Sequence, residues 1–452
     1  MSANNKSWLY LPQNIQEKTQ NSQQKPSVCI IGAGIVGLTS AYFLQKSNFF
    51  GKITIIEKEK EPGTAASFVN AGYLVFSKVI PVCEQLRNIN LSIFKYMDIN
   101  LENLYQATRF GIYAYYDFFK GALSSKYKQE RTETYSVYGE RCKETFWKIL
   151  QDEGIKESEI GLQRGCNYLY RDENKFKNSL EILEQQKKPY IIQNIPLKQN
   201  KNGYLQKMIT NNEDCTASSW HFLNILLKKM EKKGNFQLIT GKEVTELIKN
   251  EKNNRIIDGI KCKDGEIIKS NYFIFCNNGL IQHIISYPLV IMSGFSWTFY
   301  KNNTKNQALI NEVDNCPSVV DYEKCIYYSI YNDRLRVTYG FYLNPNFQKL
   351  KNDFKQYTPN FPFWKDEAEK QVENMTIGTR CVSPNGAPFL GQLGDYENAF
   401  INTGHGFIGW TLSTYTGLLL SKIILQKMGH QIEFDQIEKN IMKITNPKRY
   451  II

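Results

Sequence analysis

The stretch Val28-Cys29-Ile30-Ile31-Gly32-Ala33-Gly34-Ile35-Val36-Gly37 decides the fold of the N-terminal part of the chain. Its four leading apolar residues predict a buried strand that ends at the first glycine. Residues 32–37 match the pattern G-x-G-x-x-G, which joins a strand to a helix in dinucleotide-binding βαβ units. In such units the first glycine permits a tight turn, the second lets a pyrophosphate approach the backbone, and the third lets helix and strand pack closely. The free N–H groups at the start of the helix then face an anion.

An acidic residue follows the second strand of this unit. An apolar stripe through Leu38 and Tyr42 predicts a helix to about Lys46, and Ile53-Thr54-Ile55-Ile56 predicts the next strand. Glu57 comes directly afterwards, 25 positions after the first glycine, where a carboxylate can accept both ribose hydroxyls. An ordinary βαβ unit is the structural alternative, but the order of strand, turn, helix, strand and acid favours a dinucleotide site.

Length and composition limit the remaining possibilities. A chain of 452 residues with 42% hydrophobic residues predicts a globular protein of two domains, interleaved or consecutive. The net charge of +12 suits an acidic partner, anionic lipid or a phosphate-bearing cofactor, but an ordinary solvated surface is the preferred explanation, because the lysines are scattered throughout the chain. No concentrated arginine patch occurs, so nucleic-acid binding is not expected. The ten cysteines show no metal-ligand spacing, so we expect neither a metal site nor a disulfide framework.

The first 26 residues form a polar tail rich in Gln and Asn, with Trp8-Leu9-Tyr10-Leu11 as its apolar group. The tail lacks the apolar core of a signal peptide and the arginines of a transit peptide. A disordered tail is the simpler interpretation, and a short docking arm is the functional one. No stretch reaches the roughly 20 apolar residues of a transmembrane helix, so we expect a soluble protein or one peripheral to a membrane.

The middle of the chain changes from helical to strand-like patterns. Residues 81–154 look helical, and for the aromatic piece at 110–119 core packing is favoured over a partner or membrane face. Residues 161–192 alternate like the start of a sheet, and Gln199-Asn200-Lys201-Asn202-Gly203 looks like a linker between domains.

Further strands are predicted on both sides of residue 280. A helix at 220–233 precedes strand patterns at 236–239, 243–248, 256–268 with an Asp264-Gly265 turn, and 272–275, all expected to extend the nucleotide-binding sheet. Alternation at 295–300, 325–331 and 335–343, with an Asn332-Asp333 turn, predicts a second sheet beside the substrate.

A second glycine-rich turn lies near the C-terminus. A strand at 399–402 leads into Thr403-Gly404-His405-Gly406-Phe407-Ile408-Gly409-Trp410, and a helix continues to about Lys427. Glycine on both sides of His405 indicates a close approach of the backbone to a flat group, at a helix N-terminus suited to a ring that becomes anionic on reduction. Such a turn is sometimes only structural. Two of them at opposite ends of one chain favour a single long cofactor that contacts both.

Several groups of residues together carry a resemblance to a known family. They are the motif at 32–37, Ser67 with Asn70-Ala71-Gly72, Asn212-Glu213-Asp214-Cys215-Thr216, Asp333-Arg334-Leu335-Arg336-Val337, Ser383-Pro384-Asn385-Gly386-Ala387-Pro388 and Asn402-Thr403-Gly404-His405-Gly406. With them the chain resembles the D-amino-acid oxidase superfamily of FAD-dependent oxidoreductases, and most of all the D-amino-acid dehydrogenase group. The resemblance runs from about residue 27 to 427.

The resemblance implies a mixed α/β (α+β) fold in which a Rossmann-type FAD-binding domain is interleaved with an antiparallel-sheet substrate domain that carries helices. It assigns the FAD domain to 27–80, 204–282 and 376–452 with a C-terminal helix, and the substrate domain to 81–203 and 283–375. The tail at 1–26 lies outside both.

The resemblance also implies a reaction and its residues. An amino-acid-like substrate would be oxidised by hydride transfer from Cα to flavin N5, with Arg380 binding the carboxylate through its planar guanidinium. Glu57 would bind the adenosine ribose and Val244 the adenine. His405 is the second catalytic candidate, although between two glycines it is better placed to contact flavin and shape the turn than to act as a base. The implied FAD contacts are Gly32, Ala33, Gly34, Ile35, Val36, Gly37, Glu57, Lys58, Ala66, Ser67, Asn70, Ala71, Gly72, Val244, Cys276, Asn277, Gly404, His405, Gly406, Phe407, Ile408 and Gly409.

Three departures from the family pattern leave alternatives open. Cys381 stands at a usual proline, Asn278 at a usual glycine, and Thr338-Tyr339 where small residues are usual. Bulkier groups near the ring suggest a different substrate, such as an N-methyl amino acid or a 2-hydroxy acid. They also suggest a retired relative that holds FAD as an accessory or assembly subunit of a larger complex, such as a mitochondrial respiratory complex. By comparison with eukaryotic relatives and from the basic pI we expect a mitochondrial protein, with the cytoplasm as the alternative.

Overall fold

The structure is a computed structural model of the chain. It describes residues 7–11, 25–77, 79, 94–95, 97–185, 187–194, 205, 207–278, 287–300, 318–321, 323, 326–331, 334–346, 348–349 and 375–450. The predicted linker at 199–203, the Asn332-Asp333 turn and the start of the predicted helical region at 81–93 lie outside these residues.

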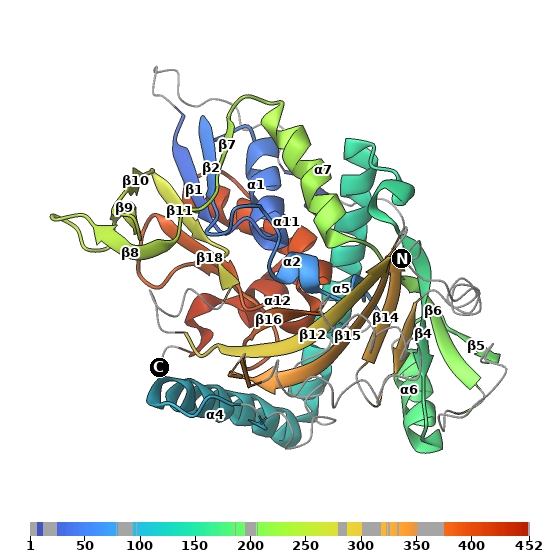
Figure 1. Cartoon of the computed structure of the whole chain (residues 1–452). Helices are drawn as coiled ribbons and strands as arrows, with labels where there is room; N and C mark the ends of the chain where they lie inside the picture. Colours follow the sequence, from blue (N-terminus) through green and yellow to red (C-terminus); the bar gives the residue numbers. More distant parts are fainter. Residues whose placement is uncertain are drawn as a thin grey trace.

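A six-stranded sheet, mostly parallel, forms the first layer of the fold (Figure 1). Its order is β17 (Phe389–Gln392), β18 (Ala399–Thr403), β11 (Tyr272–Phe275), β1 (Ser27–Ile31), β2 (Lys52–Ile56) and β7 (Phe236–Ile239). All neighbours are parallel except β17 and β18. The central strand β1 thus has β2 on one side and β11, from the middle of the sequence, on the other, which confirms the predicted βαβ unit.

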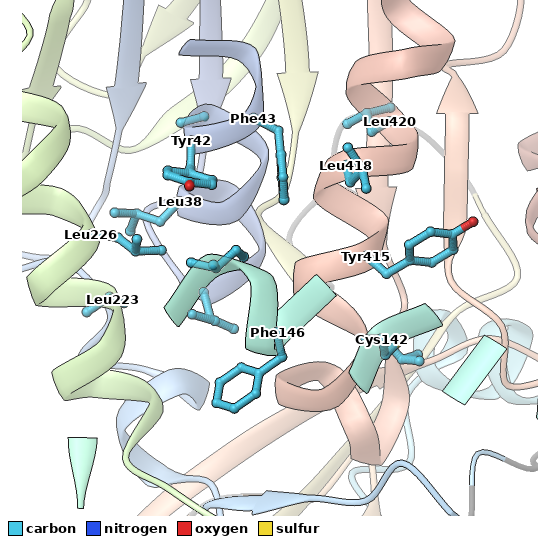
Figure 2. Close-up of a cluster of buried hydrophobic side chains, with 14 of the residues drawn as sticks. Leu38, Tyr42, Phe43, Cys142, Phe146, Leu223, Leu226, Tyr415, Leu418 and Leu420 are labelled. Carbon is cyan, nitrogen blue, oxygen red and sulfur yellow. The ribbon is translucent and has the colours of Figure 1, made fainter. Parts of the chain in front are cut away.

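Helices cover one face of this sheet. They are α1 (Ile35–Lys46), α7 (Ser219–Glu231) and α11 (Gly409–Lys427), with α5 (Ser125–Glu153) packed against α11. Figure 2 shows their shared core, where Leu38 and Tyr42 of α1 lie near Leu226 of α7 and Phe146 of α5. Because buried residues surround α1 and α11 on almost every side, their sequences carry almost no polar face.

A separate three-stranded sheet covers the opposite face. It contains β8 (Val244–Lys249), β9 (Ile257–Cys262) and β10 (Ile267–Lys269). Side chains of β1 alternate between the two faces, so Cys29 and Ile31 contact the cluster under this sheet while Val28 and Ile30 contact the helices. The prediction that the strands at 243–268 extend the nucleotide-binding sheet is therefore wrong. They form a separate sheet that packs on it.

A second large sheet has nine strands and is mostly antiparallel. Its order is β16 (Met375–Val382), β12 (Val290–Tyr300), β15 (Arg334–Leu343), β14 (Ile326–Tyr331), β13 (Val319–Asp321), β4 (Gln163–Leu169), β6 (Lys207–Thr216) and β3 (Tyr73–Leu74), with β5 (Ile191–Asn194) also on β6. The three strands predicted at 295–300, 325–331 and 335–343 are confirmed as β12, β14 and β15. β3 and β6 join this sheet although they fall within segments assigned to the FAD domain, and the domain boundaries themselves stay a prediction.

The remaining helices surround the two sheets. They are α2 (Ala66–Val69), α4 (Leu101–Leu123), α6 (Glu173–Gln185) and α12 (Gln436–Thr445), with short 3-10 turns η1 (Ser7–Leu9), η3 (Glu157–Ile160), η9 (Gly406–Ile408) and η10 (Pro447–Tyr450). The helical prediction is confirmed for 101–153, whereas the prediction of strands alone at 161–192 missed α6. The segment Gly406–Lys427 is the one described helix with the length and apolarity of a membrane span, but 83% of its apolar window is buried, as in the core helix of a globular protein.

Candidate functional site

A cavity of about 1050 Å³ runs between the two large sheets. Its lining comes from both glycine-rich turns, from β11 and β16 and from the strands β12, β14 and β15. Ligand pockets usually measure ~300–1,000 Å³, so this cavity is large enough for an extended ligand. Apart from Ala33, Gly37 and Gly404, every residue predicted to contact FAD lines it, as does Arg380.

The first glycine-rich turn forms a bare backbone cradle at one wall of the cavity. Gly32 has φ +104°, a conformation that glycine adopts without strain, and a Cβ there would lie 2.9 Å from the carbonyl oxygen of Cys276. A Cβ on Gly37 would lie 1.9 Å from the carbonyl oxygen of Gly32. Gly37 does not line the cavity. The absence of a side chain there lets α1 pack closely on the turn, as the motif predicts.

Two polar side chains hold the ends of this cradle. The N–H of Ala33 donates to Oε2 of Glu57 at 2.7 Å, and the N–H of Ile35 donates to Oγ of Ser67 at 2.9 Å. Glu57 also accepts from the N–H of Glu59 through Oε1 at 3.0 Å. The carboxylate is thus fixed at the end of β2 facing the cavity, beside Lys58 and Val244, the other residues predicted for the adenosine end.

The segment at 66–72 forms a second wall. Oδ1 of Asn70 accepts from the N–H of Gly72 at 2.7 Å, and its Nδ2 donates to Oγ of Ser219 at 2.6 Å. Arg336, which is 4% exposed, reaches the same segment from β15 and donates to the carbonyl oxygens of Phe68 and Asn70, the latter at 2.8 Å. Arg336 was not among the residues predicted for the site. The sequence feature that could have indicated its buried role is a charged residue between the apolar residues Leu335 and Val337 of a predicted strand.

The second glycine-rich turn closes the cavity opposite the cradle. His405 is buried, and its Nε2 lies 3.1 Å from Oγ1 of Thr416 on α11. Burial lowers the pKa of His405 from 6.5 to about 3, so the imidazole is neutral at physiological pH and a weak base. The structure therefore supports the predicted role in shaping the turn and does not support general-base catalysis.

Arg380 brings a positive charge to the same end of the cavity. Its Nη1 lies over Gly294 of β12, where a Cβ would come within 2.9 Å of it, and donates to the carbonyl oxygen of Gly340 at 3.3 Å. The guanidinium carbon lies 5.2 Å and 5.8 Å from the ring centres of Phe341 and Phe407. Two aromatic faces and a glycine thus hold a planar cation at the cavity wall.

Two further residues that line the cavity carry protonated, neutral side chains. Tyr168 lines the cavity and donates to Oδ2 of buried Asp214 at 3.0 Å, and burial raises its pKa well above 10.0. Burial also raises the pKa of the Cys276 thiol to about 12, so the thiol stays protonated. Tyr168, Cys276 and His405 are therefore not bases at neutral pH, and Arg380 offers the binding and orientation of an anionic group.

The three departures from the family pattern do not fill the cavity. Asn278 has φ +55°, the left-handed conformation that asparagine tolerates, and its carbonyl oxygen accepts from Oγ1 of Thr403 at 3.1 Å. It therefore takes the backbone shape of the usual glycine and still lines an open cavity. Thr338 and Cys381 line the cavity as well, and Cys381 also packs into the apolar cluster with Tyr287 and Phe389.

Buried polar atoms at the cavity wall are suited to a polar ligand. Oδ1 of Asn277, Oδ1 of Asn402 and Nε1 of Trp410 have no hydrogen-bond partner within the described protein, and all three residues line the cavity. A buried polar atom without a partner costs about 1–3 kcal/mol, so a ligand that binds these atoms recovers that free energy. With the bare cradle and the fixed Glu57, they fit a dinucleotide with a polar ring system.

Known structures show the same fold. The chain matches L-proline dehydrogenase from P. horikoshii with TM-score 0.61 and 16% identity, covering 94% of this chain and 98% of that one. It matches glycine oxidase from Bacillus cereus ATCC 14579 with TM-score 0.60 and 15% identity, covering 89% and 98% of the two chains. It matches fructosamine oxidase from Aspergillus fumigatus with TM-score 0.64 and 11% identity, covering 95% and 92%.

A family model confirms the predicted relationship from the sequence itself. The model described as DAO, FAD dependent oxidoreductase, matches residues 27–423, which include both glycine-rich turns and Arg380. The chain therefore belongs to the DAO family of FAD-dependent oxidoreductases, and its cofactor is FAD.

Proposed function

We propose that the protein oxidises an amino-acid-like substrate at the carbon that carries the amine, in the manner of the D-amino-acid dehydrogenases. The observation that carries this proposal is the placement of the Arg380 guanidinium in the same cavity as the glycine-rich cradle. The two glycine-rich turns and Glu57 would hold FAD, which would supply the hydride acceptor for oxidation at the substrate Cα. The named substrates of two structural neighbours, proline and glycine, are amino acids and agree with this choice.

Arg380 acts by binding and orienting the substrate. A guanidinium donates two parallel hydrogen bonds to a carboxylate, which fixes both the position and the plane of the substrate. The rings of Phe341 and Phe407 restrict the guanidinium and exclude water beside it. Because His405 and Tyr168 are engaged and neutral, the amine enters deprotonated and the rate acceleration comes from orientation.

The experiment is an anaerobic titration of the purified holoprotein, followed by the flavin absorbance. The panel contains D- and L-amino acids, N-methyl amino acids and 2-hydroxy acids, which share a carboxylate and differ at Cα. Bleaching by one class identifies both the substrate and the bond that is oxidised.

Arg380→Ala is expected to slow flavin reduction by about 10²- to 10⁴-fold, because two charge-assisted hydrogen bonds are lost. Arg380→Lys keeps the positive charge but loses the two parallel donors of the guanidinium, so its rate of flavin reduction should lie between those of the wild type and Arg380→Ala. Both variants should retain FAD, whereas Gly34→Val should lose it, because a side chain there meets Oγ of Ser67 and enters the cradle. Flavin reduction at the wild-type rate in Arg380→Ala would remove this residue from the proposal.

An accessory role is the second candidate, supported by the departures at 278, 338–339 and 381 and by the exposed apolar face of α4 described below. It predicts a bound flavin that no member of the panel bleaches. The mitochondrial location stays a prediction, with the cytoplasm as its alternative.

A further inference from the structure

Helix α4 carries an apolar face that points away from the protein. The face contains residues spaced three or four apart along the whole helix, each 52–87% exposed: Leu101, Leu104, Tyr105, Ile112, Tyr115, Tyr116, Phe119 and Leu123. With a rise of 1.5 Å per residue, 23 residues make a stripe about 35 Å long. Between Tyr105 and Ile112 the stripe is continued by Thr108 and Arg109, and the guanidinium carbon of Arg109 lies 5.4 Å from the ring centre of Tyr105. The prediction that residues 110–119 pack in the core is therefore wrong for Ile112, Tyr115, Tyr116, Phe118 and Phe119.

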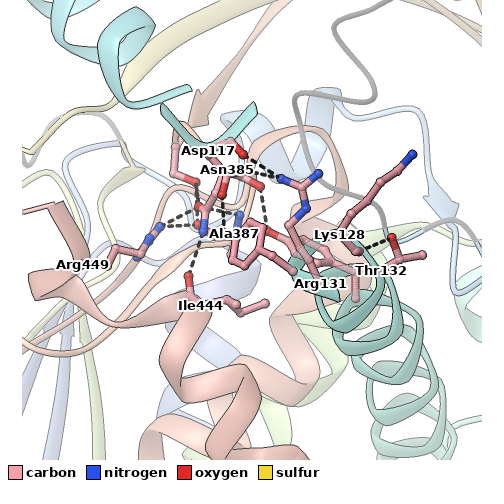
Figure 3. Close-up of polar contacts among 11 residues, drawn as sticks. Asp117, Lys128, Arg131, Thr132, Asn385, Ala387, Ile444 and Arg449 are labelled. Atoms are coloured by element: carbon pink, nitrogen blue, oxygen red, sulfur yellow. Dashed lines mark hydrogen bonds and ion pairs between the residues drawn. The ribbon is translucent and has the colours of Figure 1, made fainter. Parts of the chain in front are cut away.

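Polar contacts fix the helix in this orientation. Asp117 on the inner face forms a buried ion pair with Arg131 of α5 at 2.5 Å and accepts from the hydroxyl of Tyr127 at 2.7 Å (Figure 3). The hydroxyl of Tyr113 donates to the carbonyl oxygen of Tyr450 at 2.9 Å. A rotation that buried the apolar face would break these bonds and expose Phe110, which packs with Phe341 and Phe407. The outward face is thus a fixed feature of the surface.

The shape of this face and the exposure of its two ends favour a lipid bilayer over a protein surface with pockets. Figure 1 shows α4 as a straight ridge along one edge of the molecule. Ile99 just before the helix, Leu101 at its first residue and Leu123 at its last residue are 84–87% exposed, so the most exposed aliphatic side chains are at both ends. A protein partner usually receives such side chains in pockets, whereas a bilayer receives a whole ridge at once.

Charge selects an anionic surface over a second copy of the chain. The described residues from 94 to 128 include five basic side chains, namely Lys95, Arg109, Lys120, Lys126 and Lys128. The exposed acidic residues in the same described range are Asp98 and Glu102. The whole chain carries +12. Two copies joined through α4 would bring these basic margins together, whereas anionic lipid headgroups attract them.

We propose that α4 is an interfacial helix that docks the protein on the surface of an anionic lipid bilayer. Its apolar face enters the headgroup region, the tyrosines lie at the interface, and the lysines contact lipid phosphate and carboxylate groups. The docked edge lies beside the cavity, because Asp98 and Asn103 near the start of α4 line that cavity.

The test is flotation of the FAD-loaded full chain with vesicles of phosphatidylcholine containing about 30% phosphatidylserine, compared with phosphatidylcholine alone. We expect binding to the anionic vesicles that weakens with added NaCl, since salt screens the lysines. Ile112→Ser with Phe119→Ser should reduce it at least about tenfold, because two large apolar side chains no longer enter the bilayer. Both positions are exposed, so the thermal unfolding temperature and the bound flavin should stay unchanged.

A matched control makes the same change elsewhere on the surface. Ile182→Ser with Ile267→Ser alters exposed apolar residues of α6 and β10 and should leave vesicle binding unchanged. In Phe119→Trp, brominated lipids should quench the added indole fluorescence. Wild-type protein that floats with neither vesicle would overturn the proposal, and so would equal losses in both double variants. A wild-type dimer that becomes a monomer in Ile112→Ser with Phe119→Ser would overturn it as well, since a second copy would then cover the face.

Discussion

His405 shows how burial changes the role of a single side chain. Between two glycines it invites assignment as a catalytic base, but the folded protein lowers its pKa to about 3 from 6.5 in the unfolded chain. The unfolded state therefore binds the proton more tightly, so stability is fully present above pH 6.5 and falls as the pH drops toward 3.

From this difference we expect His405 to remove about 2 kcal/mol from the free energy of unfolding between pH 7 and pH 5. His405→Gln keeps a hydrogen-bonding group near Thr416 and cannot titrate, so its loss of stability over this range should be smaller by that amount. Denaturant unfolding of both holoproteins at the two pH values measures it. Identical pH dependence in the two proteins would show that folding does not shift the pKa of His405.

At the scale of single residues, the sequence predicts the roles of glycines that a backbone conformation or a close backbone contact requires. Gly32, Gly34 and Gly37 could be assigned from spacing alone, because a turn, a close approach and a helix contact each require glycine. Asn278 could not, because its compatibility depends on a φ of +55° that is not visible in the sequence.

At the scale of the element, the segment at 66–72 takes its position from contacts with residues that are distant in the sequence. It contains only the one-turn helix α2, and its position relies on Ser219 at the start of α7 and on Arg336 of β15, which is itself held by Thr298 of β12. Arg336 joins two of these, since its Nε donates to Oγ1 of Thr298 at 3.0 Å while its Nη1 binds the segment.

Arg336→Met should therefore weaken FAD binding by about 10- to 100-fold, because the segment that carries Ser67 loses its buried donors. Titration of the apoprotein with FAD, followed by flavin fluorescence, measures the dissociation constant. Arg255→Met makes the same change at an exposed arginine and should leave this constant unchanged. Loss of thermal stability with an unaltered dissociation constant would mean that Arg336 supports the fold and not the site.

Local patterns predict elements better than their partners. The strands at 272–275 and 399–402 were predicted, but their pairing with each other was not. The hairpin at 256–268 was also predicted, but nothing in its alternation distinguishes a strand that extends a sheet from one that packs across it. The outward face of α4 was missed for the same reason, since periodicity shows that a helix has an apolar side and not what that side contacts.

Across the whole molecule, the N-terminal and C-terminal parts of the chain are packed together. The predicted alternatives for Trp8 were a disordered tail and a docking arm, and the structure places it in the core of its own chain. Its ring lies 3.7 Å from the guanidinium carbon of Arg141 and 5.7 Å from the ring of Tyr415. Its carbonyl oxygen accepts from Nζ of Lys422, whose charge is balanced by buried Glu438 at 2.5 Å.

Trp8→Ala is expected to lower the free energy of unfolding by about 3–5 kcal/mol, the usual cost of removing a buried tryptophan. Chemical denaturation of the holoprotein gives the value. Tyr10→Ala, two residues away and half exposed, should cost less than about 1 kcal/mol. Equal small effects at both positions would show that the segment at 7–11 does not stay on the protein in solution.

The interleaving of the chain also sets the order in which the protein matures on the ribosome. The hydroxyl of Thr39 in α1 binds the carbonyl oxygen of Ser413 in α11, and 374 residues separate them. Helix α1 and strand β1 therefore leave the exit tunnel long before the elements that cover them are synthesised, and their apolar surfaces need chaperones during that interval. Flavin capture waits as well, because one wall of the cavity is made from the last quarter of the nascent chain.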